Sequence, residues 1–275
     1  MFASFSIVSG KFVQNGTHVQ VDVLFTRLPA VVFWIWLQLL VLDLANQRLP
    51  DSVTEDRLNK AWRPIPSGRL TSSGAKDLLI FSIAFTFAAS TVLLGGVYET
   101  LLLFALNWLY NDLGLANSHW CLRNLMNSLG ITTIGAGAMT VAYQGIDDAN
   151  LDRGAAYWWF FLCASVLMTT IQAQDLYDQE GDAARRRSTA PLVLGDSAAR
   201  WSVAVPVIAW SIAMPALMGL RLSKDSQVIG YAASTCTGIV LSVRVLTRRS
   251  VSDDNATFRI WAVWCMILYS LPLVI

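Results

Sequence analysis

The chain has 275 residues, of which 55% are hydrophobic and only 14% are charged. A soluble globular protein carries about 25% charged residues, so this composition excludes an ordinary soluble domain and indicates a protein that crosses a membrane several times. The net charge of +1 provides no field that would attract nucleic acid. Four scattered cysteines exclude a disulfide scaffold and show no metal-ligand spacing, so we interpret them as small buried apolar residues.

Apolar runs long enough to cross about 30 Å of hydrocarbon recur along the chain. Because a backbone in lipid must satisfy its hydrogen bonds internally, and these runs lack β-barrel alternation, we predict an all-α polytopic membrane bundle with one domain over residues 1–275. Residues 1–22 would form a polar N-terminal segment without the pattern of a cleaved signal peptide. Eight helices are predicted, at residues 23–45, 77–97, 98–110, 122–146, 155–175, 200–221, 227–247 and 257–275.

The polar connections between these helices fall on two sides of the membrane when crossings are counted. We call the side that holds 46–76, 111–121, 176–199 and 248–256 the basic face, because 15 of the 20 lysines and arginines lie nearer to it. This excess predicts that the basic face is cytosolic. Cations gathered to bind an anionic substrate would give the same excess.

Two segments of the basic face carry polar residues at helical spacing. The first motif, residues 43–69, combines acids, amides and cations on one expected helix face before Pro64 and Pro66, which should end the helix. Its candidate site residues are Asn46, Glu55, Asp56, Asn59, Lys60 and Arg63, with Asp43 and Gln47 on the same stripe as Asn46. Acids and cations on one face can bind a metal ion together with the anion that it neutralises.

The second motif, residues 175–189, places Asp175, Asp178 and Asp182 at i, i+3 and i+7, which predicts three carboxylates on one helical stripe. Such like charges repel by roughly a few tenths of a kcal/mol per pair, and a divalent cation would remove the conflict. Mg²⁺ prefers hard oxygen ligands and usually couples carboxylates to substrate phosphates. The spacing therefore predicts a Mg²⁺ site.

A third polar cluster lies where the third predicted helix ends and the fourth begins. Asn107 and Asn111 form one i, i+4 pair, and Arg123 and Asn127 form another. Amides within a membrane helix are costly unless they are paired, so the cluster predicts a polar wall inside the bundle. Hydrogen bonding between helices is an equally good interpretation of Asn124 and Asn127.

Each motif alone has an ordinary structural explanation. A charged stripe at a helix end is usually a solvated surface, and clustered carboxylates are only probabilistic markers of a site. However, both motifs combine acids with cations that follow them, and an even number of crossings places both on the same face. This combination favours a shared functional site.

With these motifs the chain resembles the UbiA superfamily of intramembrane prenyltransferases. The matching residues are Arg63-Pro64 after the first motif, and Asp175-x-x-Asp178-x-x-Gly181-Asp182 with Arg187 and Thr189 in the second. The resemblance covers about residues 40 to 200 in motifs and continues to the C-terminus in hydropathy.

The first motif departs from the prenyltransferase pattern NDxxDxxxD, which would ask for acids at Gln47, Pro50 and Thr54. Its acids come later, as Glu55-Asp56, in a string that looks like the fungal branch of the superfamily with membrane-bound sesquiterpene cyclases. Family members generally have nine membrane helices. The eight counted here would lack a first helix that precedes residue 23.

The resemblance implies a bundle around a central cavity that binds Mg²⁺ and a prenyl diphosphate such as farnesyl diphosphate. It implies metal ligation by Glu55, Asp56, Asp175, Asp178 and Asp182, with Asp56, Asp175 and Asp178 as the catalytic residues. The diphosphate-binding residues would be Asn46, Asn59, Lys60, Arg63, Asn111, Arg123 and Arg187. Candidates for stabilising a carbocation, by position, are Trp34, Trp36 and Trp108.

The preferred hypothesis is a terpene cyclase that ionises the diphosphate to an allylic cation and cyclises it. An alternative is a prenyltransferase that passes the cation to an aromatic acceptor in meroterpenoid secondary metabolism. A third is a transporter or scaffold, which acids gathered at helix ends and the lack of an internal repeat argue against. We expect an integral protein of the endoplasmic reticulum that contacts membrane lipid, with no nucleic-acid partner and no obligate protein partner.

Overall fold

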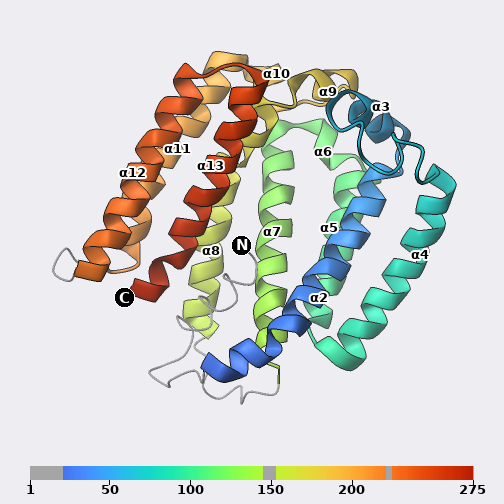
Figure 1. Cartoon of the computed structure of the whole chain (residues 1–275), viewed down its shortest axis with the longest axis horizontal. Coiled ribbons are helices and arrows are strands. Elements are labelled where there is room, and N and C mark those ends of the chain that lie inside the picture. Colours follow the sequence, from blue (N-terminus) through green and yellow to red (C-terminus); the bar gives the residue numbers. More distant parts are fainter. Residues whose placement is uncertain (1–20, 145–152, 221–224, 275) are drawn as a thin grey trace.

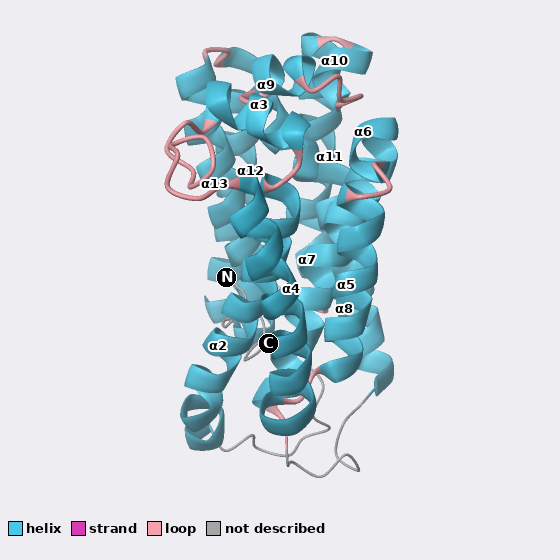
Figure 2. Cartoon of the chain, turned by 90° about the vertical axis from the view of Figure 1, so that its right-hand side faces the viewer, coloured by secondary structure: helices cyan, strands magenta, loops and turns pink. Residues whose placement is uncertain are grey.

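The computed structural model describes residues 21–144, 153–220 and 225–274. Within these ranges every regular element is a helix (Figure 2). Seven helical segments are long and apolar enough to cross a membrane. The all-α membrane bundle predicted from the sequence is therefore confirmed for this part of the chain, whereas the predicted polar segment 1–22 and the family's first helix fall almost entirely outside it.

The long helices form two groups that lie side by side (Figure 1). The first group contains α2 (Val21–Gln47), α4 (Ser72–Ala89), α5 (Val97–Asn111) and α7 (Trp120–Ala142). The second contains α8 (Arg153–Thr170), α11 (Asp196–Leu217), α12 (Asp225–Thr247) and α13 (Val251–Ser270). The short helices α3 (Pro50–Asn59), α6 (Leu115–Ser118), α9 (Gln179–Ala184) and α10 (Ala190–Leu194) cover one end of both groups (Figures 1 and 2). This end is the basic face.

The predicted helix 98–110 exists as α5 but is shorter than the other crossings. Its 15 residues extend roughly 22 Å at 1.5 Å per residue, less than the hydrocarbon thickness. A π-helical turn at Ser90–Leu94 precedes it, and Gly95 and Gly96 reverse the chain with φ of 80° and 72°. A Cβ at Gly96 would lie 3.2 Å from the ring of Trp34, so both backbone conformation and packing favour glycine there.

Each group of helices has its own apolar core. Trp34, Leu37 and Val141 are buried in the first group, and Trp159 and Trp264 are buried in the second. The outward faces of the same helices carry exposed large apolar side chains, which suits helices that pack in lipid.

A buried arginine joins the helices of the second group near the basic face. Arg200 on α11 donates to both carboxylate oxygens of Asp254 on α13, at 2.8 and 2.7 Å. It also donates to the carbonyl oxygens of Val245 and Arg248 at 2.9 Å and to the carboxylate of Asp196. Arg200 therefore ties α11, the end of α12 and the start of α13 together.

We predict that Arg200→Ala lowers the free energy of unfolding by about 3–5 kcal/mol, because Asp254 would remain as a buried charge without its partner. Arg249→Ala is the matched control, since Arg249 is exposed and its 3.3 Å pair with Asp196 should contribute at most about 1 kcal/mol. Thermal and denaturant unfolding in detergent measure both effects. Equal destabilisation by the two variants would contradict the assignment of Arg200 as the clamp.

Candidate active site

The first motif forms α3 and the turn that follows it. Pro50 occupies the first helical position, where its missing N–H leaves no donor unsatisfied. The helix ends at Asn59, earlier than the sequence predicted, because Pro64 has no N–H for the carbonyl of Lys60 four residues before it, and its ring would clash with that carbonyl in a continuous helix. The expected continuous stripe is therefore wrong beyond Asn59. Arg63 instead folds back, and its Nη1 donates to Asp56 Oδ1 and Oδ2 at 2.8 and 3.0 Å.

The second motif is also broken where a single stripe was predicted. A 3-10 helix at Ile171–Leu176 continues α8, and α9 begins only at Gln179. Because the tighter 3-10 turn rotates side chains differently from an α-helix, the three aspartates face different partners. Asp175 contacts α7, whereas Asp178 and Asp182 turn toward α3 and Arg187.

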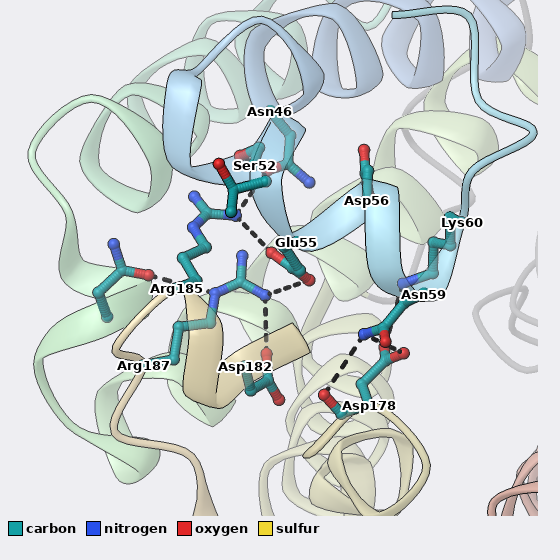
Figure 3. Close-up of polar contacts among 12 residues, drawn as sticks. Asn46, Ser52, Glu55, Asp56, Asn59, Lys60, Asp178, Asp182, Arg185 and Arg187 are labelled. Atoms are coloured by element: carbon teal, nitrogen blue, oxygen red, sulfur yellow. Dashed lines mark hydrogen bonds and ion pairs between the residues drawn. The ribbon is translucent and has the colours of Figure 1, made fainter. Parts of the chain in front are cut away.

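The two motifs meet where α3 packs against α9. A Cβ at Gly181 would lie 2.1 Å from Asn59 Nδ2, so only glycine permits this approach without a shift. Asn59 Nδ2 donates to Asp178 Oδ1 at 3.2 Å, and Lys60 Nζ lies 3.1 Å from Asp178 Oδ2 (Figure 3). Residues more than a hundred positions apart in the sequence thus form one site.

Glu55 is the centre of a buried ionic network between the motifs (Figure 3). Its Oε2 accepts from Arg185 Nη1 at 3.0 Å and its Oε1 accepts from Arg187 Nη1 at 2.9 Å. Arg187 Nη1 also donates to Asp182 Oδ1 at 3.1 Å. Burial alone would raise the pKa of Glu55, but Arg187 and Arg185 together hold it below its ordinary value, so Glu55 stays ionised.

The pKa of Asp178 is shifted in the opposite direction from that of Glu55. Burial raises the pKa of Asp178 above its ordinary value, and although Lys60 opposes this effect, the nearby charges of Asp182 and Glu55 add to it. Negative charge at this position is therefore incompletely compensated. A further cation near Asp178 would relieve the repulsion.

A further ion pair joins the two helix groups. Arg123 Nη2 on α7 donates to Asp175 Oδ1 at 2.9 Å, and Arg123 Nη1 donates to the hydroxyl of Tyr110 on α5 at 2.8 Å. Arg123 and Asp175 are both buried. The predicted polar wall is therefore present at Arg123.

The donor set suits a hard cation, although the side chains are paired with one another. Within the described ranges, no three His, Cys, Asp or Glu side chains lie together in a group that could hold a metal ion. However, Asp175 Oδ2 and Asp182 Oδ2 are buried and have no hydrogen-bond partner among these residues. Buried carboxylate oxygens without donors are suitable ligands for Mg²⁺.

Next to the ionic network lies a cavity of about 270 Å³ between α2, α5 and α7. Its polar lining residues, toward the basic face, are Asp43, Asn46, Asn107, Tyr110, Asn111 and Asn127. Its apolar lining residues are Leu39, Leu42, Leu103, Leu106, Met126, Gly130, Ile131 and Ile134. Asn46 connects cavity and network, because its Oδ1 accepts from Ser52 Oγ at 3.2 Å and from Arg185 Nη1 at 3.4 Å.

A second cavity, of about 330 Å³, lies beside the first under the start of α3 and the end of α5. Asn111 lines both cavities, and Arg185 and Asn117 line the second one. Asn117 Oδ1 also accepts from Arg187 Nε at 3.2 Å. The ionic network therefore borders two adjoining spaces.

The sequence did not identify every residue of this site. Arg185 is not a candidate from the sequence, because three adjacent arginines carry no pattern that shows which of them are buried in the site. The structure buries Arg185 and Arg187 and leaves Arg186 exposed, with a positive φ of 57°. Tyr110 was likewise missed as an aromatic side chain in the cavity wall.

The structure does not support the three tryptophans as candidates for stabilising a carbocation. Trp34 is fully buried and packs against Gly137, below the cavity. Trp36 and Trp108 are more than half exposed, on the outer surface of the bundle, and none of the three lines the cavity. Sequence position along a helix does not distinguish an inward aromatic from one that faces lipid when both surroundings are apolar.

Comparison with known proteins supports the assignment from motifs. A model of the UbiA prenyltransferase family matches residues 51–266. Fumagillin beta-trans-bergamotene synthase from Aspergillus fumigatus is 33% identical over 184 residues, which are 67% of this chain and 61% of that protein, so the match spans less than two thirds of its length. Somaliensene A/B synthase from Streptomyces somaliensis is 29% identical over 87% of this chain and 80% of its own. Polyprenyl transferase eriF from Hericium erinaceus is 28% identical over 96% of this chain and 88% of its own length.

Solved structures share the fold at low sequence identity. A UbiA homolog from Aeropyrum pernix K1 in its apo form has a TM-score of 0.64 and 15% identity, and covers 99% of this chain and 94% of its own. A UbiA homolog from Archaeoglobus fulgidus bound to GPP and Mg²⁺ has a TM-score of 0.58 and 14% identity, with coverages of 99% and 94%. The resemblance inferred from the two motifs is confirmed: the chain belongs to the UbiA prenyltransferase family.

Proposed function

We propose that this chain is a Mg²⁺-dependent terpene cyclase that ionises a prenyl diphosphate, such as farnesyl diphosphate, and cyclises the allylic cation. The observation that carries the proposal is the order of polarity along the bundle axis. The ionic network of the two motifs adjoins a cavity whose wall changes from polar to apolar away from the basic face. A prenyl diphosphate has the same order, from a charged head to a hydrocarbon tail.

The charges of the network balance before any ligand binds. The acids are Glu55, Asp56, Asp175, Asp178 and Asp182, and their ion-pair partners are Lys60, Arg63, Arg123, Arg185 and Arg187. A diphosphate with its metal ions brings both signs of charge into the site. The cations can then turn to the diphosphate and the carboxylates to the metal, which exchanges partners without leaving a buried charge unpaired.

The residues of this chain would hold and orient the substrate. Lys60, Arg63 and Arg187 would donate charge-assisted hydrogen bonds to the diphosphate oxygens. Mg²⁺ bound by carboxylates from among Glu55, Asp56, Asp175, Asp178 and Asp182 would supply Lewis-acid assistance to the departure of the diphosphate. The leucine and isoleucine wall would keep water from the allylic cation, and the ring of Tyr110 would stabilise it by roughly 0.5–2 kcal/mol.

The relatives support this choice of reaction. Two of them are named synthases of bergamotene and of somaliensene, and Archaeoglobus fulgidus UbiA homologs have been solved with DMAPP or GPP and Mg²⁺. The first motif lacks the NDxxDxxxD acids of prenyltransferases. The names of the two synthases and the missing acids of the first motif favour cyclisation over transfer.

One observation favours a prenyltransferase as the second candidate. The second cavity shares Asn111 with the first and borders Arg185, so it gives an acceptor room beside the diphosphate network. The polyprenyl transferase relative aligns with 96% of this chain.

The membrane-length helices and the family membership make the chain an integral multi-pass membrane protein. We further propose that it resides in the endoplasmic reticulum with the basic face cytosolic, as the excess of lysine and arginine on that face supports.

We predict that the purified chain in lipid nanodiscs, given farnesyl diphosphate and Mg²⁺ without an acceptor, releases diphosphate and a cyclic hydrocarbon. EDTA should abolish the release. Product that forms only after an aromatic acid or phenol is added would support the prenyltransferase instead. If no diphosphate is released from geranyl, farnesyl or geranylgeranyl diphosphate, with or without acceptor, both the cyclase and the prenyltransferase proposals are rejected.

We predict that Arg187→Gln raises the KM for the prenyl diphosphate about ten- to hundred-fold, since a hydrogen bond to a charged group contributes about 1.5–3 kcal/mol. Arg186→Gln is the matched control, because Arg186 is the exposed neighbour. Steady-state kinetics compare the two, and thermal midpoints in the same detergent show whether the Glu55 network still folds. Equal KM values for the two folded variants would show that Arg187 does not bind the diphosphate.

We predict that Gly181→Ala separates α3 from α9 and lowers kcat/KM about a hundred-fold, because displacements of about 1 Å have effects of this size. Ala183→Ser is the control, since it also adds one heavy atom to α9 but at an exposed position. If Gly181→Ala keeps full activity, the close approach of the motifs is not needed for the reaction.

A further inference from the structure

Two glycines of α7 lie seven residues apart and therefore on nearly the same helix face. At Gly137 the space for a side chain is filled, since a Cβ there would lie 2.1 Å from the ring of Trp34. At Gly130 no atom of the described residues lies within 4 Å of an added Cβ, and Gly130 lines the cavity next to the ionic network. One gap is closed by the protein itself, and the other is left open.

Glycine within a helix is less stable than alanine, because it loses more backbone freedom on folding. At Gly137 the packed indole explains the glycine. At Gly130 neither a positive φ nor a close neighbour requires it. A residue that lowers helix stability without a packing reason is expected where function needs the space.

Gly130 lies at the level where the cavity changes from polar to apolar. The α7 wall runs from Met126 to Ile134, roughly 12 Å along the helix axis. Asn127 lies one turn from Gly130 toward the ionic network, and Ile134 lies one turn away in the opposite direction. Ile134 and Leu103 are both buried and close the apolar end.

We propose that Gly130 determines which prenyl chain the cavity accepts. The inference rests on the proposed function, because it takes the ionic network as the site of the diphosphate. With the head held there, the hydrocarbon tail passes Gly130 before it reaches Ile134 and Leu103. A branched side chain at position 130 would occupy the path of the tail and exclude the longer chains, whereas a short chain would still fit. The native glycine therefore admits farnesyl or longer diphosphates in addition to geranyl diphosphate.

The test is a series of increasing side-chain size, Gly130→Ala, Gly130→Val and Gly130→Leu. Diphosphate release and binding of unreactive thiolodiphosphate analogues are measured with geranyl, farnesyl and geranylgeranyl chains. We expect Val and Leu to lower kcat/KM and affinity at least ten-fold for the longest chain that the native protein accepts, with less than a three-fold change for geranyl. Gly130→Ala should keep or raise the thermal midpoint.

Two control variants on α7 separate chain selection from general damage. Leu129→Phe adds bulk at an exposed position of the same helix and should leave the chain-length profile unchanged. Gly137→Ala forces a methyl group against Trp34 and should lower the thermal midpoint.

The inference is overturned if Gly130→Val and Gly130→Leu weaken all three chains equally, or if their profile equals that of the native protein. Failure of the proposed function has a different signature, namely that the native protein releases diphosphate from none of the three substrates. In that event the analogue-binding series still decides the role of Gly130. If binding of the analogues does not depend on chain length in a way that the Gly130 variants change, the role of Gly130 is rejected as well.

Discussion

The contact between Glu55 and the two arginines of the second motif is the interaction on which the site depends. Glu55 belongs to α3, which follows α2 of the first helix group, while Arg185 and Arg187 follow α9 in the connection between α8 and α11 of the second group. Separating buried charges from their partners is strongly unfavourable. The requirement that these charges remain paired therefore sets how the two groups align at the basic face.

The same pairing explains why a metal-bound diphosphate suits this site better than a simple ion. A lone anion would take the arginines and leave the carboxylates unpaired, and a lone cation would do the reverse. A ligand that carries both charges satisfies both sets at once. The raised pKa of Asp178 and the unpartnered oxygens of Asp175 and Asp182 indicate where the charges remain least satisfied.

The two helix groups contribute different parts of the candidate site. The cavity lies within the first group, between α2, α5 and α7, whereas Asp175, Asp178 and Asp182 come from the second. The apolar space and half of the ionic head site are therefore built by different parts of the chain. Gly181 permits α3 and α9 to approach closely enough to join them.

Hydropathy by itself located the seven helices of membrane length, because each helix in lipid satisfies its own backbone and its length follows from the bilayer, whereas the shorter α5 departs from that rule. Counting crossings also placed both motifs on one face. The sequence did not reveal that the stripes at Asp56–Arg63 and Asp175–Asp182 are interrupted, since periodicity assumes a continuous helix. It did not separate Arg185 from Arg186 or inward from outward tryptophans. Those distinctions depend on contacts between segments as far apart as Asn59 and Asp178, 119 residues along the chain, which only tertiary packing creates.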